Sequence, residues 1–588
     1  MDGHLFGVTG LILIQKESNL SYALEDLNES KTVLYTEDHE FKRLIIDSLS
    51  VFTEGYKFMP SFRAGIWDGK KHFSTITENG DIMFPKGLIS YVLKKLKEQK
   101  KEYTYKKITY EHITEPTKQE FDKWIDTLGL PFTPYDYQSQ SAYDAIRHKR
   151  LVIQAATGAG KSLILSFIMQ WQYKEKRKTL LIVPNVLLLQ QMKQDLIDYF
   201  GECNFNDRIV TIGGNSVMTK EEKEATFADD SVIISTWQSL YSNSDLVKDV
   251  ECIIVDEAHG AKGDSIATLA TAAESCSWRI GLTGTMPRAY ADKMSILAIL
   301  GQGKVYITPQ GLVERGLATP VHITTMFFNY SEEDRKIVKS LKKYPDEIKF
   351  LNQHDIRNEK VAKITTKMAQ IGNTLLLFDV VAHGKKMLEM LVKQKTHHNK
   401  VRLIDKFTPK FVKETFEPDA LMVFNGEITE KEIKKYKKIL SELEDYEVQP
   451  TYNPDMLKSL SDFDVYFIYG GVEASQREEI RQLVKDRKNV TIVGNYQTVS
   501  TGLNIPNLMN IILGASTKSF IRLGQTIGRG MRLHHSKNNM NLIDICDDLT
   551  YKTSRSEKKN YVMKHFQARL VEYLEWGYPI VEKEINVF

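Results

Sequence analysis

The chain has 588 residues, of which 42% are hydrophobic, 10% aromatic and 26% charged. This composition excludes an intrinsically disordered chain, a collagen-like fibre and a coiled-coil rod, and at roughly 150 residues per domain it predicts three or four domains. The 79 basic and 76 acidic residues give a net charge of +3, so any nucleic-acid surface has to be local. The 4 cysteines form no CxxC pair, which excludes a disulfide framework and a zinc ribbon.

In chain order, residues 1–112 are expected to form a small N-terminal α+β domain, with a turn at Asn79-Gly80. Short apolar strands then alternate with helices over 113–320 and again over 321–546, the pattern of parallel α/β domains. A stretch rich in Lys and Glu, about 402–462, is predicted to be an insertion in the second of them. Residues 547–588 are expected to be a C-terminal helical tail.

Two further expectations concern the environment of the chain. We find no targeting segment and no run of about 20 uncharged apolar residues, so the sequence predicts no membrane contact. With so few cysteines, a reducing, cytoplasmic compartment is expected.

The strongest motif is a Gly-rich turn between the predicted strand 151–154 and the predicted helix 163–170. Backbone N–H groups of such a turn and of the helix N-terminus bind phosphate. Lys161 is expected to reach the β- and γ-phosphates of ATP, and the Ser162 hydroxyl to bind Mg²⁺. The strict pattern has Gly at position 155, where this chain has Ala. The predicted nucleotide-binding residues of this turn are Thr157, Gly158, Ala159, Gly160, Lys161 and Ser162.

Two acidic residues, Asp256 and Glu257, follow the apolar strand 252–255. Carboxylates at the carboxyl end of a parallel strand lie beside the phosphate loop of the same sheet. We expect Asp256 to hold Mg²⁺, and Glu257 to orient and deprotonate the attacking water.

Gln525, Arg529 and Arg532 recur at helical spacing in the second α/β half. Arginines neutralise the charge that develops on a transferring phosphoryl group. Because these residues are far in sequence from Lys161, the pattern predicts that ATP lies between two domains and holds them together.

Taken together, these motifs resemble those of superfamily-two helicases and translocases. Further stretches match in order over about 135–535: Tyr137-Gln138, Val183-Pro184-Asn185, Ser235-Thr236-Trp237-Gln238, Leu282-Thr283-Gly284-Thr285, Phe378 to Lys385 and Ser500-Thr501-Gly502-Leu503. The resemblance implies two tandem RecA-like parallel-sheet domains with ATP and Mg²⁺ between them. It implies that Gln138 reads adenine, that Gly502 lies at the nucleotide, and that nucleic acid is contacted by Pro184, Thr236, Trp237 and Thr501. Members of this class ordinarily lack the insertion at 402–462.

The run from Gly55 to Lys71 and the segment Pro85-Lys86-Gly87-Leu88 resemble the N-terminal domain of the UvsW-type helicases of T-even phages. This resemblance implies a DNA helicase of recombination, repair and replication that acts on forks, R-loops, D-loops and Holliday junctions. The implied partners are branched and single-stranded DNA, RNA–DNA hybrids and a single-stranded DNA-binding protein. The implied compartment is the cytoplasm of the host cell.

Basic residues interleaved with aromatic ones support a local DNA surface. From Glu54 to Tyr110 the sequence has 12 Lys or Arg against 6 Asp or Glu, a local net charge of +6. Such residues contact phosphates and stack on unpaired bases. The candidates are Arg63, Trp67, Lys70 and Lys71.

Three other functions stay open at this point. A DEAH-type RNA helicase would be stimulated by RNA, and a double-strand translocase would move along DNA without separating its strands. An ATP-gated clamp or annealing factor would hydrolyse ATP slowly and form duplex.

Overall fold

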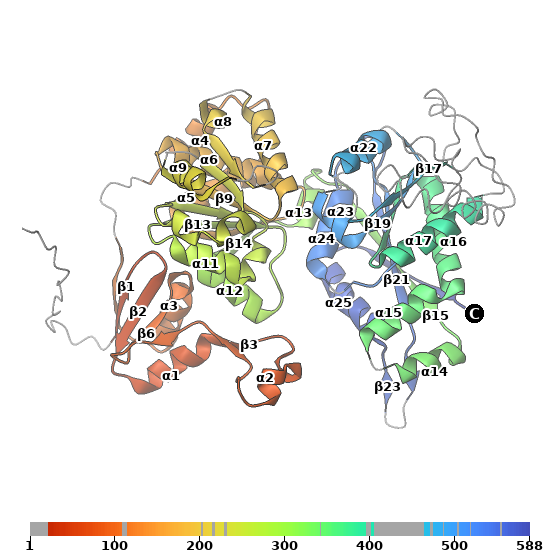
Figure 1. Ribbon diagram of the computed structural model, residues 1–588, viewed down its shortest axis with the longest axis horizontal. Helices are drawn as coiled ribbons and strands as arrows, with labels where there is room; N and C mark the ends of the chain where they lie inside the picture. The colour runs from red at the N-terminus through yellow and green to blue at the C-terminus, as the bar shows by residue number, and fades with distance from the viewer. Residues whose placement is uncertain are drawn as a thin grey trace, which may run out of the picture.

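One small mixed sheet and two large parallel sheets organise the chain, in this order along the sequence (Figure 1). The computed structural model describes residues 22–108, 115–201, 204–213, 218–228, 232–341, 343–395, 402–404, 464–470, 474–485, 487–502, 505–517, 519–552 and 556–588. The predicted insertion at about 402–462 lies outside these residues, apart from the short strand β17 (Arg402–Ile404).

The N-terminal unit has a five-stranded sheet in the order β5-β6-β2-β1-β7. Its strands are β1 (Tyr22–Asp26), β2 (Lys31–Thr36), β5 (Thr75–Ile76), β6 (Ile82–Pro85) and β7 (Thr104–Lys106). Helices α1 (His39–Ser48) and α3 (Ile89–Glu98) cover it, because apolar residues recur at helical spacing in both. A separate two-stranded ribbon, β3 (Ser50–Phe52) with β4 (Lys70–His72), carries helix α2 (Pro60–Arg63).

The first large sheet has seven parallel strands in the order β10-β11-β9-β12-β13-β8-β14. They are β8 (Arg150–Ala155), β9 (Thr179–Val183), β10 (Ile209–Ile212), β11 (Val232–Thr236), β12 (Cys252–Val255), β13 (Trp278–Thr283) and β14 (Gln302–Ile307). The central strands β9, β12 and β13 are buried throughout because helices cover both faces of the sheet. These helices include α5 (Asp136–His148), α6 (Lys161–Lys174), α7 (Val186–Phe200), α11 (Asp264–Ala272) and α12 (Tyr290–Leu300).

The second large sheet has eight parallel strands in the order β17-β18-β19-β16-β20-β21-β15-β24. Besides β17 they are β15 (Val321–Asn329), β16 (Thr374–Phe378), β18 (Asp464–Ile468), β19 (Thr491–Asn495), β20 (Asn510–Leu513), β21 (Met540–Asp548) and β24 (Ile580–Asn586). Its helices are α14 (Glu332–Ser340), α15 (Tyr344–Gln353), α16 (Asp355–Ile371), α17 (Val381–Lys395), α22 (Ala474–Lys485), α23 (Tyr496–Gly502), α24 (Phe520–Gly530) and α25 (Tyr561–Glu575).

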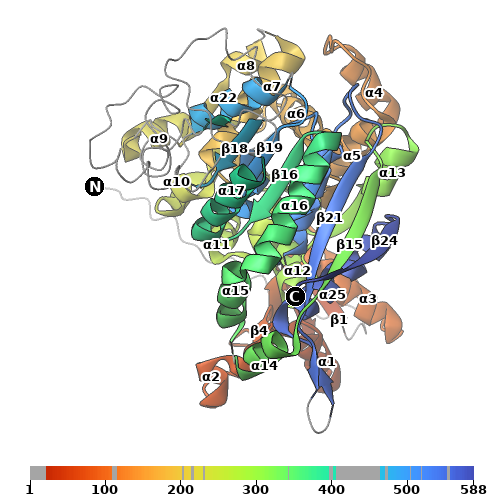
Figure 2. The same cartoon turned by 90° about the vertical axis from the view of Figure 1, so that its right-hand side faces the viewer.

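The C-terminal segment differs from the helical tail that the sequence predicts. It contains the helix α25, but its last strand, β24, pairs in parallel with β15 and forms the edge of the second sheet (Figure 2). Ile580 and Ile585 of β24 are half-buried, and its other five residues are exposed. Three of the exposed residues, between the two isoleucines, are charged. A charged, exposed sequence of this kind suits the edge of a sheet, where it discourages pairing with another chain.

The N-terminal unit is joined to the first large sheet by a shared core and by buried charges. Four residues of α12 belong to the hydrophobic cluster of the N-terminal unit: Ala291, Met294, Leu297 and Ala298. Gly87 approaches this helix so closely that a Cβ atom there would lie 2.2 Å from the carbonyl oxygen of Leu297. The two parts therefore form a single packed body.

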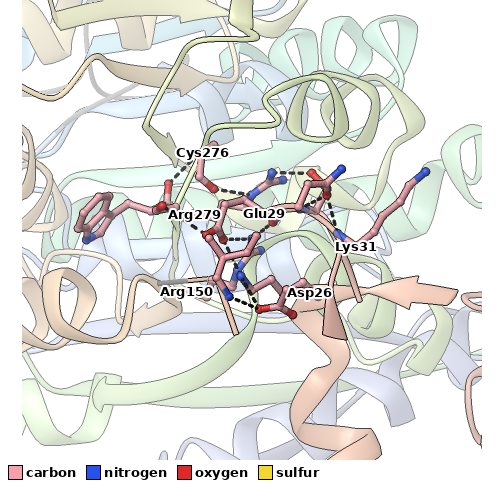
Figure 3. A network of polar contacts seen from close by, with 12 residues as sticks. Asp26, Glu29, Lys31, Arg150, Cys276 and Arg279 are labelled. Carbon is pink, nitrogen blue, oxygen red and sulfur yellow. Dashed lines mark hydrogen bonds and ion pairs between the residues drawn. The ribbon is translucent and has the colours of Figure 1, made fainter. Parts of the chain in front are cut away.

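A polar network completes this junction (Figure 3). The Arg150 guanidinium donates to the backbone carbonyl of Glu29, and its Nη2 lies 3.4 Å from the Glu29 carboxylate. Arg279 donates to the Ser30 hydroxyl at 2.7 Å, and Lys86 pairs with Glu29 at 2.9 Å. Buried charges that are paired in this way are costly to separate, so the network fixes the orientation of the unit.

Among the residues that the structure describes, no helix is long and apolar enough to cross a membrane.

Candidate active site

The phosphate-binding loop lies between β8 and α6, as the sequence predicts. Gly158 and Gly160 have φ of +89° and +75°, a region that favours glycine, and a Cβ at Gly160 would lie 2.3 Å from the Gln138 side chain. The Lys161 ammonium folds back to within 3.5 Å of the Ala155 carbonyl oxygen. Ala155 itself is fully buried at the end of β8, so the fold accommodates the methyl group that replaces the usual glycine.

Gln138 supports this loop from the start of α5. Its Nε2 donates to the Ala159 carbonyl at 2.9 Å, and its Oε1 accepts from the Tyr135 N–H at 2.9 Å. The Tyr137 hydroxyl donates to the same Ala159 carbonyl at 3.0 Å. Both ends of the Gln138 amide thus bond within the chain, which fixes its orientation beside the loop. A carboxamide has a second N–H and a second oxygen lone pair, and the predicted contact with adenine would use these.

The acidic pair lies at the carboxyl end of β12, beside the loop. The Asp256 N–H donates to the Ile182 carbonyl at 2.9 Å, and Glu257 has a left-handed φ of +48°, which is strained for a residue with a side chain. The His259 ring lies 3.2 Å from the Glu257 carboxylate and also 3.2 Å from the Thr283 hydroxyl. This imidazole therefore links the acidic pair to the end of the neighbouring strand β13.

The two carboxylates have opposite electrostatic environments. Burial and the negative charge of Glu257 raise the pKa of Asp256, against the charge of Lys161. Burial also raises the pKa of Glu257, but the hydrogen bond from His259 and the charges of Lys161 and Arg529 outweigh it and hold that pKa well below its usual range. Glu257 is thus an ionised acceptor that can orient water, while Asp256 would be stabilised by a cation.

Helix α24 brings the second half of the chain to the phosphate loop. A Cβ at Gly528 would lie 2.3 Å from the Thr157 Cβ, so the two halves meet in van der Waals contact here. The next residue, Arg529, interacts electrostatically with Glu257, and burial lowers the pKa of Arg529 to about 10. Gln525 is half-buried one helical turn earlier on α24. The structure thus brings residues about 270 apart in sequence into one cleft.

Two residues that sequence reasoning missed lie beside Ser162. The Ser162 hydroxyl is 2.8 Å from the Tyr199 hydroxyl, and Asp195 also interacts with it. The positive charge of Arg532, which belongs to the second half, interacts with both Asp195 and Tyr199. Tyr199 and Asp195 are four residues apart on α7, but this spacing suits any helix and gave no signal of a site.

A second set of missed contacts closes the cleft between the halves. Arg288, five residues after the end of β13, forms ion pairs with Glu572 and Glu575 of α25. Trp576, directly after α25, packs near Thr285 and Gly524. A small cavity of about 40 Å³ remains between the halves here.

Of the predicted nucleic-acid residues of the motor, Pro184 and Trp237 are half-buried and Thr236 is buried. Thr236 pairs with Val183 in the sheet register, so Thr236 lies beside Pro184 at one edge. The Thr236 hydroxyl is bound to Ser239 at 2.9 Å and its side chain is buried, while Trp237 packs against the hydrophobic core. Thr501 and Gly502 lie in α23, where only their backbone is described.

The four candidates of the N-terminal unit also differ in exposure. Arg63 is exposed at the end of α2, and its guanidinium lies 6.0 Å from the Phe58 ring centroid. Trp67 is half-buried, and its indole N–H donates to the Lys70 carbonyl at 2.8 Å. The ammonium groups of Lys70 and Lys71 lie over the rings of Phe52 and Phe73.

Comparisons with known families match three parts of the chain. Residues 27–106 match a model described as "DNA helicase UvsW, N-terminal", and residues 131–288 match "Type III restriction enzyme, res subunit". Residues 427–534 match "Helicase conserved C-terminal domain". This last match begins at residue 427, so it includes part of the segment that the sequence predicts to be an insertion. The parallel-sheet fold and the three matches together define a class: an ATP-driven helicase.

Within that class the chain resembles the UvsW helicases of T-even phages. It is 26% identical over 558 residues to the "ATP-dependent DNA helicase uvsW" of Enterobacteria phage T4, covering 92% of this chain and 95% of that protein. It is 24% identical over 225 residues to the "DNA 3'-5' translocase XPB2" of Sulfurisphaera tokodaii, covering 37% of this chain and 47% of that one. The crystal structure of T4 UvsW matches with 24% identity and a TM-score of 0.43, covering 97% of this chain and 100% of that one.

Proposed function

We propose that this protein is an ATP-dependent DNA helicase that acts on branched DNA: forks, R-loops, D-loops and Holliday junctions. The similarity to T4 uvsW runs through the N-terminal unit as well as the motor, and this extent carries the proposal. The N-terminal unit is the part that a general helicase motor lacks. The similarity to phage helicases also supports action in the cytoplasm of a host cell, with a single-stranded DNA-binding protein as a partner.

In the proposed hydrolytic site, Lys161 binds the β- and γ-phosphates and the N–H groups of the loop hold their oxygens. Ser162 and Asp256 would hold Mg²⁺, which neutralises phosphate charge; hydroxyl and carboxylate oxygens are ligands that this ion prefers. The raised pKa of Asp256 fits such a role, because a cation would relieve the repulsion between the two carboxylates.

The water that attacks the γ-phosphate would be oriented by Glu257, whose low pKa keeps it ionised. Arg529 approaches from the other half and would stabilise the charge that develops in the transition state. Arg532, which faces Asp195 and Tyr199 in this structure, would turn toward the phosphates. The Ser162 hydroxyl can donate to Tyr199 and bind the metal through an oxygen lone pair at the same time.

Each cycle would then close and open the cleft between the two halves, residues 113–320 and 321 onward. Because the second sheet ends with β24, we assign residues 547–588 to the second half. Pro184 and Thr236 on one half and Thr501 on the other would hold the nucleic-acid backbone in turn, Thr236 through its main chain because its side chain is buried. Alternating grip on one strand moves the motor along it.

The test is the steady-state ATPase rate without nucleic acid and with single-stranded DNA, a forked duplex, a four-way junction and matched RNAs. We expect branched DNA to stimulate hydrolysis more than linear DNA or RNA does. Equal or stronger stimulation by RNA would overturn the proposal in favour of an RNA helicase, and no stimulation would favour an ATP-gated clamp. Stimulation by duplex DNA without strand separation in a displacement assay would favour a translocase.

A further inference from the structure

The ribbon β3–β4 and the segment between its strands form a lobe, residues 52–70, whose outer surface is apolar. Ile66 and Phe58 have 82% and 77% of their surface exposed, the two highest values among the large hydrophobic side chains described. Met59 and Phe52 are also exposed. Single exposed hydrophobic residues are common, but four within 15 residues form a patch, and patches mark binding sites.

The lobe presents these side chains on a well-packed base. Tyr56 stacks on Phe52 with ring centroids 4.5 Å apart, and it meets Phe62 edge-on at 4.8 Å. Gly69 lies against the Tyr56 ring, where a Cβ would come within 2.4 Å, and the Thr53 N–H donates to the Gly69 carbonyl at 2.9 Å. The inner aromatic rings therefore form a small core, and Phe58 and Ile66 are held outside it.

Charge on the lobe indicates what the patch binds. The Arg63 guanidinium lies over the Phe58 ring, and the Lys57 ammonium lies 5.8 Å from the Tyr56 ring centroid. One of the two acidic groups, Asp68, is already bound by the Lys70 N–H and by His72. An exposed ring beside a guanidinium suits nucleic acid, since a base stacks on the ring while the cation binds the adjacent phosphate.

The lobe also lies apart from both the cleft and the N-terminal sheet. In Figure 1, α2 stands below the gap between the two halves of the motor, away from the strands that carry Pro184 and Thr236. The two helical elements of the lobe, η1 (Tyr56–Phe58) and α2, contain no buried residue. Packing within the lobe accounts for Tyr56 and Phe62, but not for the exposed side chains of Phe58 and Ile66.

We propose that the lobe is a second nucleic-acid site, where Phe58 stacks on the unpaired or terminal bases at a branch point, Ile66 packs against them and Arg63 binds the neighbouring phosphate. This inference rests on the proposed function, because it assumes that the chain binds branched DNA. It adds the residues that distinguish a branch from a linear strand. A motor that grips only backbone cannot make this distinction.

The test compares the affinity of the full-length protein for a forked duplex and for linear single-stranded and double-stranded DNA, by fluorescence anisotropy without nucleotide. The variants are Phe58→Ala, Ile66→Ser and the double substitution. We expect Phe58→Ala to bind the fork about tenfold more weakly, since stacking on one base contributes about that much, and the double variant to lose the preference for forks. Phe58→Trp, which keeps an aromatic ring at this position, should retain the preference for forks.

Ile76→Ser is the matched control, because Ile76 is 64% exposed in the same unit but lies outside the lobe. It should bind every DNA within twofold of the wild type. The melting temperature of each variant should equal that of the wild type, because the substituted side chains are exposed. A 2-aminopurine base at the junction gives a direct readout, and its fluorescence should change on binding of the wild type but not of the double variant.

Wild-type fork affinity in the double variant would overturn the inference and leave the patch to a protein partner. An equal loss of affinity for linear DNA would overturn the assignment to branch points. Because binding is measured without ATP, these results do not depend on ATP hydrolysis. Failure of the proposed function would appear separately, as a wild-type ATPase that no DNA stimulates.

Discussion

The contact between Gly528 and Thr157 can be tested by adding a single methyl group. In Gly528→Ala the new Cβ would lie 2.3 Å from the Thr157 Cβ, whereas carbon atoms pack at about 3.5–4.0 Å. The two halves must therefore separate by roughly 1 Å or more, and Arg529 moves away from the phosphate site with them. A displacement of about 1 Å at an active site costs about 100-fold in rate, or roughly 2.7 kcal/mol.

The fold itself should not suffer, because alanine is a better helix former than glycine by about 1 kcal/mol. We therefore expect kcat for ATP hydrolysis to fall about 100-fold, while the melting temperature holds or rises. Binding of a fluorescent ATP analogue should change little, since Lys161 and its loop belong to the other half. Separate measurement of kcat, nucleotide affinity and melting temperature checks all three.

Gly524→Ala is the control on the same helix. A Cβ there would meet its nearest neighbours, Thr285 and Trp576, at 3.4 Å, an ordinary contact. Its kcat should stay within about threefold of the wild type. If the kcat of Gly528→Ala also stays within threefold of the wild type, the two halves do not come as close during hydrolysis as they do in this structure. That result would refute the reasoning.

Three further predictions concern the cleft and the second half. Glu257→Gln should lower kcat about 1,000-fold and still bind ATP, whereas Lys161→Ala should lose ATP binding; normal turnover in Glu257→Gln would exclude it as the base. Arg288→Ala removes the cation beside the Glu572 carboxylate, which is only 5% exposed, so the KM for ATP should rise about tenfold, and a double-mutant cycle with Glu572→Gln should show coupling. Burial and the positive charges of Arg357 and Lys386 together lower the pKa of His383 to about 3. The unfolded chain therefore takes up a proton as the pH falls below about 6.5, and the folded chain does not. The free energy of unfolding should therefore drop by about 2 kcal/mol between pH 7 and pH 5 in urea titrations, and His383→Gln should abolish that component.

The sequence predicts the local parts of the site well because each is encoded by neighbouring residues. The loop before Lys161 needs glycine where φ is positive, and the carboxylates after β12 need only a strand before them. The alternation of apolar strands with helices likewise predicts the two parallel sheets. Contacts between distant residues leave no such pattern. The ion pair of Arg288 with Glu572 joins positions far apart in the sequence. Each residue, considered alone, has the character of an ordinary charged surface residue, so neither predicts the pair.

Two features that the sequence patterns do not show have physical reasons as well. β24 has the composition of a solvent-exposed segment and is a strand because it pairs with β15, so no local pattern predicts it. Thr236 and Gln138 match the expected motifs, but their polar atoms bond to Ser239 and Ala159 within the fold. A motif identifies residue types; it does not show which partner a hydroxyl or amide has.

The shared core between the N-terminal unit and α12 has an evolutionary consequence. A unit with its own core can be gained, lost or exchanged between proteins. Removal of this one would expose Ala291, Met294, Leu297 and Ala298 to water, and would take Glu29 away from Arg150 and Ser30 away from Arg279. Its surface and that of the motor must therefore change together, one compensating substitution at a time. Transplanting it onto another helicase would require the transfer of α12 as well.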